Sequence, residues 1–355
     1  MTRIFHMTRH MFRNKFKLRE LLVVGALLLF IASLQGLNLL NDYKRHNFRV
    51  KTVLLVYPDM SAKDVEKHLV QGGYVARPAS LKRAFRRQKV ALRLKPGRYE
   101  ILPHYTSIYV ARMLTHGWQS PAELTLSGTI RTRASLASKI SRQMMADSAS
   151  IDKALRDSSL LASLGFDTTN VFSLFIPDTY EMDWTASVED IFKKFRKEYI
   201  SFWTNDKKGL AREQGLTPLQ VSILASIVNG ETRYEPEMPS IAGVYLNRLH
   251  SGMKLQADPT VAYCFGYKLN RILGIHIQVN SRYNTYKYEG LPPGPICVPS
   301  KAAIEAVLQP DTNGYMFFCA SPAFDGTHLF ATSFGEHSRN ARAFRRALDE
   351  RNIMK

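Results

Sequence analysis

The sequence contains few cysteines and no pattern that would pair them. Cys264, Cys297 and Cys319 are the only three among 355 residues, and none belongs to a CxxC pair. Neither a zinc site nor a dense disulfide framework is therefore indicated, and at most one disulfide could form. Because free cysteine behaves as a small hydrophobic residue, we expect ordinary, semi-buried thiols at these positions. We expect no metal and no cofactor.

Acidic residues are also scarce: 30 Asp and Glu stand against 49 Lys and Arg, for a net charge of +19. Such an excess predicts attraction to an anionic partner, whether nucleic acid, membrane head groups or an acidic polymer, and charge alone does not choose among them. The hydrophobic content of 45% is that of a folded protein and excludes general disorder. The length allows two or three domains.

Only one long apolar run is present, Leu21 to Leu40, and it contains no charged residue. It has about the 20 residues that a helix needs to cross a bilayer. It is longer than the apolar core of a signal peptide, and no clear A-x-A cleavage site follows it. We therefore predict an uncleaved transmembrane helix at 21–40, preceded by a basic cytoplasmic tail at 1–20. Everything after Asn41 would then lie outside the cytoplasm, which argues against nucleic acid as a partner.

The rest of the chain is typical of an α+β fold. In residues 49–117 we expect a small α+β module, with a strand near 50–58, a helix that starts after Ser61 and a strand and turn over 90–101. The module also contains a basic cluster, which is either a solvated face or a contact with anionic lipid or glycan. Its residues are Lys82, Arg83, Arg86, Arg87, Lys89, Arg93, Lys95 and Arg98. Residues 121 to about 204 repeat this pattern, and the aromatic residues of the amphipathic helix at 187–203 are expected in the core.

The main catalytic candidate is Glu231. Thr217 to Gln220 form a capping-box pattern with proline at the first helical position, so a helix should begin there. Glu231 follows Leu224 by seven residues and Ile227 by four, which places it on the face that turns toward the core. Burial would raise its pKa, as a general acid requires. The alternative is a glutamate that caps its helix or pairs with an arginine.

Several elements should surround this acid. We expect a second helix at 241–252, capped by Ser240 and ended near Gly252, and then a polar loop over 255–263. A stiff, aromatic and proline-rich loop follows at 283–300. Beyond it the pattern predicts a short helix capped by Ser300, a hairpin within 315–332 and a terminal helix from about Phe334.

At this point six blocks of sequence are similar to a known family. In family order they are 94–101, 176–181, 224–232, 243–263, 283–296 and 325–330. Their sequences are LKPGRYEI, IPDTYE, LASIVNGET, GVYLNRLHSGMKLQADPTVAY, YNTYKYEGLPPGPI and DGTHLF. Together they resemble the endolytic murein transglycosylases, the YceG-like (MltG) family.

The resemblance implies a single-pass enzyme of the bacterial inner (plasma) membrane whose catalytic region is periplasmic. In such an enzyme Glu231 would protonate the glycosidic oxygen between MurNAc and GlcNAc and then act as base while the C6 hydroxyl closes onto C1, which leaves a 1,6-anhydro end. Residues 49–117 would be a LysM-like module, and 118–355 the catalytic region with its core at 205–355. Peptidoglycan strands and cell-wall synthases would be the partners.

The same resemblance gives six further candidates for the substrate cleft: Gln256, Asp258, Thr260, Asn284, Tyr286 and His328. Residues alone favour a structural role for His328. Two other functions stay open. One is a muramidase that hydrolyses the same bond with water, using Asp258 or Glu237 as second carboxylate. The other is a membrane-tethered, non-catalytic scaffold that binds the wall.

Overall fold

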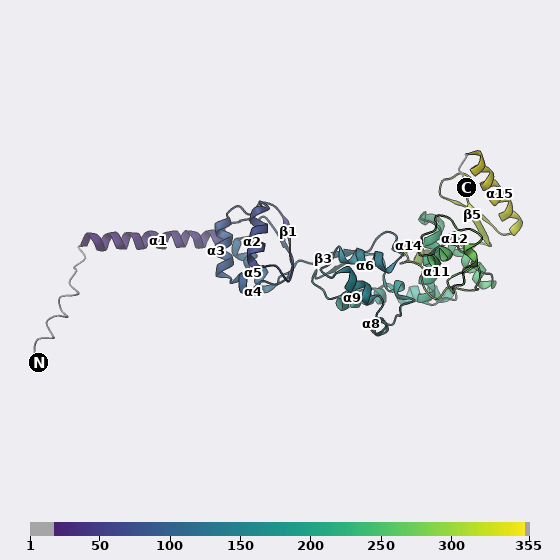
Figure 1. Cartoon of the computed structure of the whole chain (residues 1–355), viewed down its shortest axis with the longest axis horizontal. Helices are drawn as coiled ribbons and strands as arrows, with labels where there is room; N and C mark the ends of the chain where they lie inside the picture. The colour runs from purple at the N-terminus through teal and green to yellow at the C-terminus, as the bar shows by residue number, and fades with distance from the viewer. Residues whose placement is uncertain (1–17, 352–355) are drawn as a thin grey trace, which may run out of the picture. The chain divides into compact units, whose positions relative to one another are not determined.

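The computed structural model describes residues 18 to 351 (Figure 1). Most of the predicted tail at 1–20 lies outside the described residues. Internal contacts divide the chain into two compact units, with the division after Pro121. The first unit combines helices with one two-stranded antiparallel sheet, and the second combines helices with two such sheets. This confirms the predicted α+β class.

The first helix, α1 (Leu18–Lys44), contains the apolar run and extends past the predicted 21–40 at both ends. Its 27 residues correspond to about 40 Å at 1.5 Å per residue, more than the roughly 30 Å of a bilayer core. It is the one helix among the described residues that is long and apolar enough to cross a membrane, with a mean hydropathy of 2.1. None of that apolar window is buried in the protein.

The rest of the first unit packs four helices against one hairpin. Strand β1 (Thr52–Val56) pairs with β2 (Gly97–Ile101). The helices are α2 (Ala62–Gln71), α3 (Pro78–Arg87), α4 (Val90–Arg93) and α5 (Ser107–His116). The strand predicted over 90–101 is wrong in its first part, because 90–93 form a helical turn that buries Val90 in the core. Packing there overrides the strand preference of Val90.

A buried ion pair joins the end of α1 to α3. The Asp42 carboxylate is completely buried and accepts two hydrogen bonds from the Arg83 guanidinium, at 2.7 and 3.1 Å. The Ser80 hydroxyl donates a third, at 2.7 Å. The last turn of the apolar helix is therefore fixed to the folded module by a charge whose bonds are satisfied.

Replacing Asp42 by alanine should destabilise the first unit by roughly 2–4 kcal/mol, because Arg83 loses its partner in a mostly buried setting. Hydrogen exchange of the α3 and β2 amides in the full chain in detergent would measure this loss. Asp64→Ala is the matched control, since that exposed acid only completes the capping box of α2, and its loss should destabilise the unit less. Equal losses in both variants would contradict a stabilising role for the pair.

The second unit begins with a helical layer around one hairpin. Strand β3 (Ala122–Thr125) pairs with β4 (Thr179–Met182), and a 3-10 turn, η1, lies at Val171–Leu174. The helices are α6 (Arg133–Ser141), α7 (Ser148–Ala154), α8 (Ser158–Ser163) and α9 (Val188–Phe202). Ile191, Phe192 and Phe195 of α9 are completely buried, so the prediction that this aromatic face forms core is confirmed.

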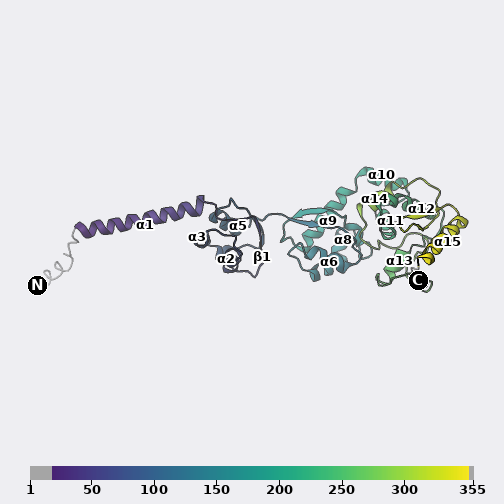
Figure 2. The ribbon, with the colours of Figure 1, turned by 90° about the horizontal axis from the view of Figure 1, so that it is seen from above.

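The remainder of this unit is built on α11 (Pro218–Glu231), which packs against α12 (Met238–His250) and α14 (Lys301–Leu308) (Figures 1 and 2). The other elements are α10 (Asn205–Glu213), η2 (Glu235–Glu237), α13 (Asp258–Cys264), η3 (His276–Gln278), β5 (Phe317–Ala320), β6 (His328–Ala331) and α15 (Phe334–Glu350). Strands β5 and β6 form the predicted hairpin, and Ser300 and Phe334 mark helix starts as predicted.

Two local predictions here are wrong. Ser240 does not cap the second helix, because the chain enters α12 directly from η2 and Ser240 lies in its first turn, where its hydroxyl donates to Asp311. The expected loop over 255–263 contains a helix, α13, with proline in its first turn, a position that suits proline because no backbone donor is needed there. The C-cap of α12 is Ser251, one residue before the predicted Gly252. All three cysteines are free, as predicted.

Candidate active site

Helix α11 carries Glu231 to the middle of the second unit. The Thr217 side chain accepts a hydrogen bond from the Gln220 backbone N–H, and the Gln220 side chain accepts one from the Thr217 backbone N–H, so the predicted capping box is confirmed. From Val221 to Val228 every residue of the helix is buried. Glu231 is the last helical residue, where the negative end of the helix dipole disfavours a carboxylate.

The Glu231 carboxyl lies against α12. The Tyr245 hydroxyl donates a hydrogen bond of 2.5 Å to Glu231 Oε1. Burial raises the pKa of Glu231 from 4.5 to about 7. The Tyr245 bond and the Arg248 charge lower this pKa, and Asp258 raises it, so burial decides the balance. The predicted rise is confirmed, and this group is able to hold or release a proton near neutral pH.

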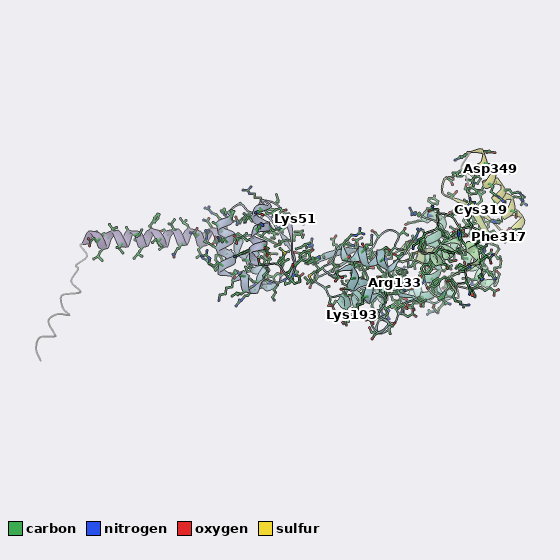
Figure 3. All side chains as sticks on the ribbon, viewed as in Figure 1. Lys51, Arg133, Lys193, Phe317, Cys319 and Asp349 are labelled. Carbon is green, nitrogen blue, oxygen red and sulfur yellow. The ribbon has the colours of Figure 1, made fainter. Side chains whose placement is uncertain are left out.

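Glu231 faces a cavity of about 290 Å³ in the second unit. Three of the predicted cleft residues, Gln256, Asp258 and Tyr286, line it. The other lining side chains come from α12, the loop after it, the hairpin and the terminal helix: Tyr245, Arg248, Leu255, Phe317, Phe318, Phe334 and His337. Figure 3 labels Phe317 on β5. This combination of polar groups and aromatic rings suits a sugar, which has hydroxyl edges and apolar faces.

Arg248 supplies a fixed positive charge. Its side chain is buried, with Nε donating to the Met316 carbonyl at 2.7 Å and Nη1 to the Leu255 carbonyl at 2.6 Å. Its guanidinium carbon lies 5.3 Å from the centre of the Phe317 ring. Burial lowers the pKa of Arg248. In the described part of the chain no carboxylate lies within ion-pair distance of it, so its charge acts on the cavity.

The three predicted residues in the cavity are held differently from one another. The Tyr286 hydroxyl donates to Asp258 Oδ1 at 2.7 Å. Gln256 has a φ of +51°, a left-handed conformation that non-glycine residues adopt at an energetic cost. Its backbone N–H donates to the Thr285 carbonyl, which fixes this conformation and leaves the side chain exposed.

Thr260, Asn284 and His328 do not line the cavity. The buried Thr260 hydroxyl donates to the Ala257 carbonyl, and the buried Asn284 amide donates to the carbonyls of Ile277 and Val279. These two residues support the loops that carry Asp258 and Tyr286.

His328 instead bonds to Glu237. Its backbone N–H and its ring Nδ1 each lie 2.7 Å from a Glu237 oxygen. Glu237 is itself 8% exposed, so this acid fastens η2 to β6 and is not free to serve as a second catalytic carboxylate. The sequence pattern had left that role open to it.

Reasoning from the residues alone did not indicate Tyr245 as a site residue, and it considered Arg248 only as a possible ion-pair partner of Glu231. The available signal was their spacing: Tyr245 and Arg248 are three residues apart on one helical face. Nothing in the sequence shows that this face meets the end of α11.

Known proteins resemble this chain over much of its length. The model of the YceG-like family matches residues 54–343, which is most of the chain. The chain belongs to the YceG-like family. The resemblance inferred from the six motif blocks is thereby confirmed, and the match includes Glu231 and every predicted cleft residue.

Two curated relatives and one solved structure are similar to this YceG-like chain. The endolytic murein transglycosylase of Bacillus subtilis is 34% identical over 164 residues, 46% of this chain and 45% of the relative. That of Streptococcus pneumoniae (strain D39) is 28% identical over 173 residues, 46% of this chain and 30% of the relative. The matches thus span half or less of these relatives. A yceG-like protein of Listeria monocytogenes shares the fold, with a TM-score of 0.52 and 24% identity over 81% of this chain and 98% of that one.

Tyr245→Phe should raise the pKa of Glu231 above about 7. The reason is that the hydrogen bond which this change removes stabilises the ionised carboxylate in the wild type. A charge-assisted hydrogen bond predicts a rise on the order of one pH unit. Carbon-13 NMR titration of the glutamate carboxyls in the full chain would measure it. Tyr286→Phe, which removes a phenol bonded to Asp258 instead, should change this pKa much less. An unchanged pKa in Tyr245→Phe would show that the bond does not set it.

Glu231→Gln should stabilise the protein at pH 8 and have less effect at pH 5. The folded-state pKa, about 7, lies above the unfolded value of 4.5, so the folded state binds the proton more tightly and stability falls as pH rises between these values. The variant removes an unfavourable contribution of the ionised carboxyl to the free energy of folding, at most about 3 kcal/mol at pH 8 and about 1 kcal/mol at pH 5. Denaturant unfolding of both proteins at the two pH values tests this. A gain independent of pH would exclude burial of the charge as its cause.

Proposed function

We propose that this chain is a membrane-anchored, endolytic peptidoglycan lytic transglycosylase. The observation that carries the proposal is a glutamate with a pKa of about 7 in a cavity of a YceG-like chain. The relatives from Bacillus subtilis and Streptococcus pneumoniae named endolytic murein transglycosylase support the substrate class. Peptidoglycan glycan strands would be the substrate.

In the proposed reaction protonated Glu231 gives its proton to the glycosidic oxygen between MurNAc and GlcNAc, and the bond from that oxygen to MurNAc C1 breaks. The carboxylate left behind takes the proton of the MurNAc C6 hydroxyl while this oxygen bonds to C1. Glu231 ends protonated, as it began, and a 1,6-anhydro end forms without water. One carboxyl thus performs both proton transfers, unlike the paired acids of ordinary glycosidases.

The neighbours of Glu231 suit this cycle. The Tyr245 hydroxyl bonds to Glu231 and favours its carboxylate form, the form that takes the proton of the C6 hydroxyl. Arg248 also favours that form. Gln256, Asp258 and Tyr286 offer hydrogen bonds to sugar hydroxyls, whereas we assign Thr260, Asn284 and His328 to positioning the surrounding loops and hairpin.

A muramidase is the competing enzyme, and Asp258 is the observation that favours it. Asp258 lines the same cavity as Glu231 and acts on its pKa. It could activate water as a second carboxylate. Its bond from Tyr286 instead indicates a group that is held to bind substrate. A non-catalytic scaffold gives no reason to bury an acid at this cost in stability.

We propose further that α1 crosses the plasma membrane once, with the N-terminus in the cytoplasm and the second unit outside it. The length and hydropathy of α1 support this topology. The module at 49–117, proposed to be LysM-like, would then follow the membrane helix in the chain and contact the wall through its basic cluster. Cell-wall synthases are the partners expected at that place, and nucleic acid is not.

Glu231→Gln should reduce product release from peptidoglycan sacculi by at least about 100-fold, because a general acid contributes about that much or more. The full chain in detergent would be assayed by mass spectrometry of the soluble products, and wild type should yield 1,6-anhydro-MurNAc ends. Glu235→Gln is the control, since that acid is exposed and outside the cavity, and it should keep its activity.

Other outcomes would separate the alternatives. Reducing MurNAc ends in place of anhydro ends would show a muramidase. Equal release by wild type and Glu231→Gln would reject the catalytic residue. A wild type that binds sacculi and releases nothing would leave the scaffold.

A further inference from the structure

A second cavity of the same unit, about 260 Å³ in volume, is rich in arginine. Arg131, Arg133 and Arg156 line it together with the rings of Phe172, Tyr263 and Tyr267, and no acidic residue does. Figure 3 labels Arg133, the first residue of α6. A concave site with cations and aromatic walls is suited to an anion that carries an apolar part.

Two of these three arginines carry a charge that no carboxylate pairs with among the described residues. Arg156 pairs with Asp152 at 2.9 Å. In the part of the chain that the structure describes, Arg131 and Arg133 have no such ion pair. Arg133 Nη2 donates to the Thr168 carbonyl, but its Nε is buried and has no hydrogen-bond partner. A buried donor without a partner costs free energy, and a bound acceptor would remove that cost.

The walls of this arginine cavity are held in place before any ligand arrives. Ile130 bridges to Val298, which fixes Arg131 with its guanidinium carbon 4.8 Å from the centre of the Tyr267 ring. The Tyr267 hydroxyl donates to the Ile296 carbonyl at 2.6 Å. Tyr267 also has a φ of +60°, a conformation that is strained for a residue with a bulky side chain. Strain of this kind is found at binding sites.

Helix α13 connects the arginine cavity to the catalytic one. Asp258, at its first position, lines the cavity of Glu231, whereas Tyr263 and Tyr267, at and just beyond its other end, line the arginine cavity. Its seven residues span about 10 Å. A polymer bound at Glu231 could therefore reach the arginine cavity with a substituent of a few residues.

We propose that the arginine cavity binds a carboxylate of the peptide attached to the glycan strand that is cut at Glu231. The proposal rests on the proposed function, in which the substrate is peptidoglycan. Guanidinium groups bind carboxylates through paired hydrogen bonds, and the aromatic wall can cover the apolar part of the peptide. This cavity would thus make the enzyme prefer strands that carry peptides over bare ones.

The test compares Arg131→Gln and Arg133→Gln with wild type on two substrates, peptide-bearing strands and strands stripped of their peptides. Both variants should lose about tenfold in kcat/KM on peptide-bearing strands, mainly through KM, and less than about twofold on stripped strands. Arg142→Gln is the control, because it lies at the other end of α6 and bonds to Ser138 outside the cavity. Thermal unfolding of each variant would show that it is folded.

Two kinetic results would overturn the proposal while leaving the proposed function intact. One is an equal loss on both substrates in folded variants, which would mean a general role in glycan binding. The other is no loss on either substrate.

A binding experiment keeps the proposal testable if no Glu231-dependent cleavage is found. Full-length Glu231→Gln would be titrated with a disaccharide-peptide and with the same compound whose peptide carboxylates are converted to amides. The carboxylate form should bind about tenfold more tightly, and adding Arg131→Gln should remove that difference. Equal binding of the two forms would overturn the proposal. So would competition in which inorganic phosphate displaces the bound disaccharide-peptide at a lower concentration than free peptide needs.

Discussion

The carboxyl of Glu231 lies at the end of a helix that is buried over eight successive residues, and this position sets its pKa. Burial and the negative end of the helix dipole favour the protonated acid. Tyr245 and Arg248 oppose them and stabilise the ionised form. The balance leaves a group whose two protonation states are close in free energy near neutral pH, as one residue that both gives and takes a proton requires. The fold accepts a cost in stability to keep it there.

Polar residues that never face the cavity maintain this arrangement. The Thr260 and Asn284 side chains are completely buried and bonded to backbone carbonyls, and the Glu237 carboxylate bonds to both the backbone and the ring of His328. Satisfied buried groups of this kind fix loop geometry, because breaking any one bond leaves an unpaired group without water. They hold the strained backbone of Gln256 and the Asp258 carboxylate at the edge of the cavity.

Helix α11 also supports the arginine cavity. The Ser226 hydroxyl accepts a hydrogen bond from the Ile296 backbone at 3.0 Å, and the Ile296 carbonyl accepts from Tyr267. The helix that ends in Glu231 therefore holds one wall of the arginine cavity, and α13 holds another. A substrate that contacts both cavities would be aligned by the same core that sets the pKa of Glu231.

The sequence by itself determined the elements and the acid. The capping box at Thr217, the spacing of Glu231 from Leu224 and the hairpin at 317–331 depend on neighbouring residues, and periodicity shows them. The motif blocks identified the family for the same reason, since they are local. Only the tertiary structure decided which side chains meet. Tyr245 bonds to Glu231, His328 bonds to Glu237, and Ser240 bonds to Asp311 instead of capping its helix. Packing between elements distant in sequence overrides local preference in each case. Contacts between elements that are distant in sequence produce no periodic pattern, so a single sequence does not predict them.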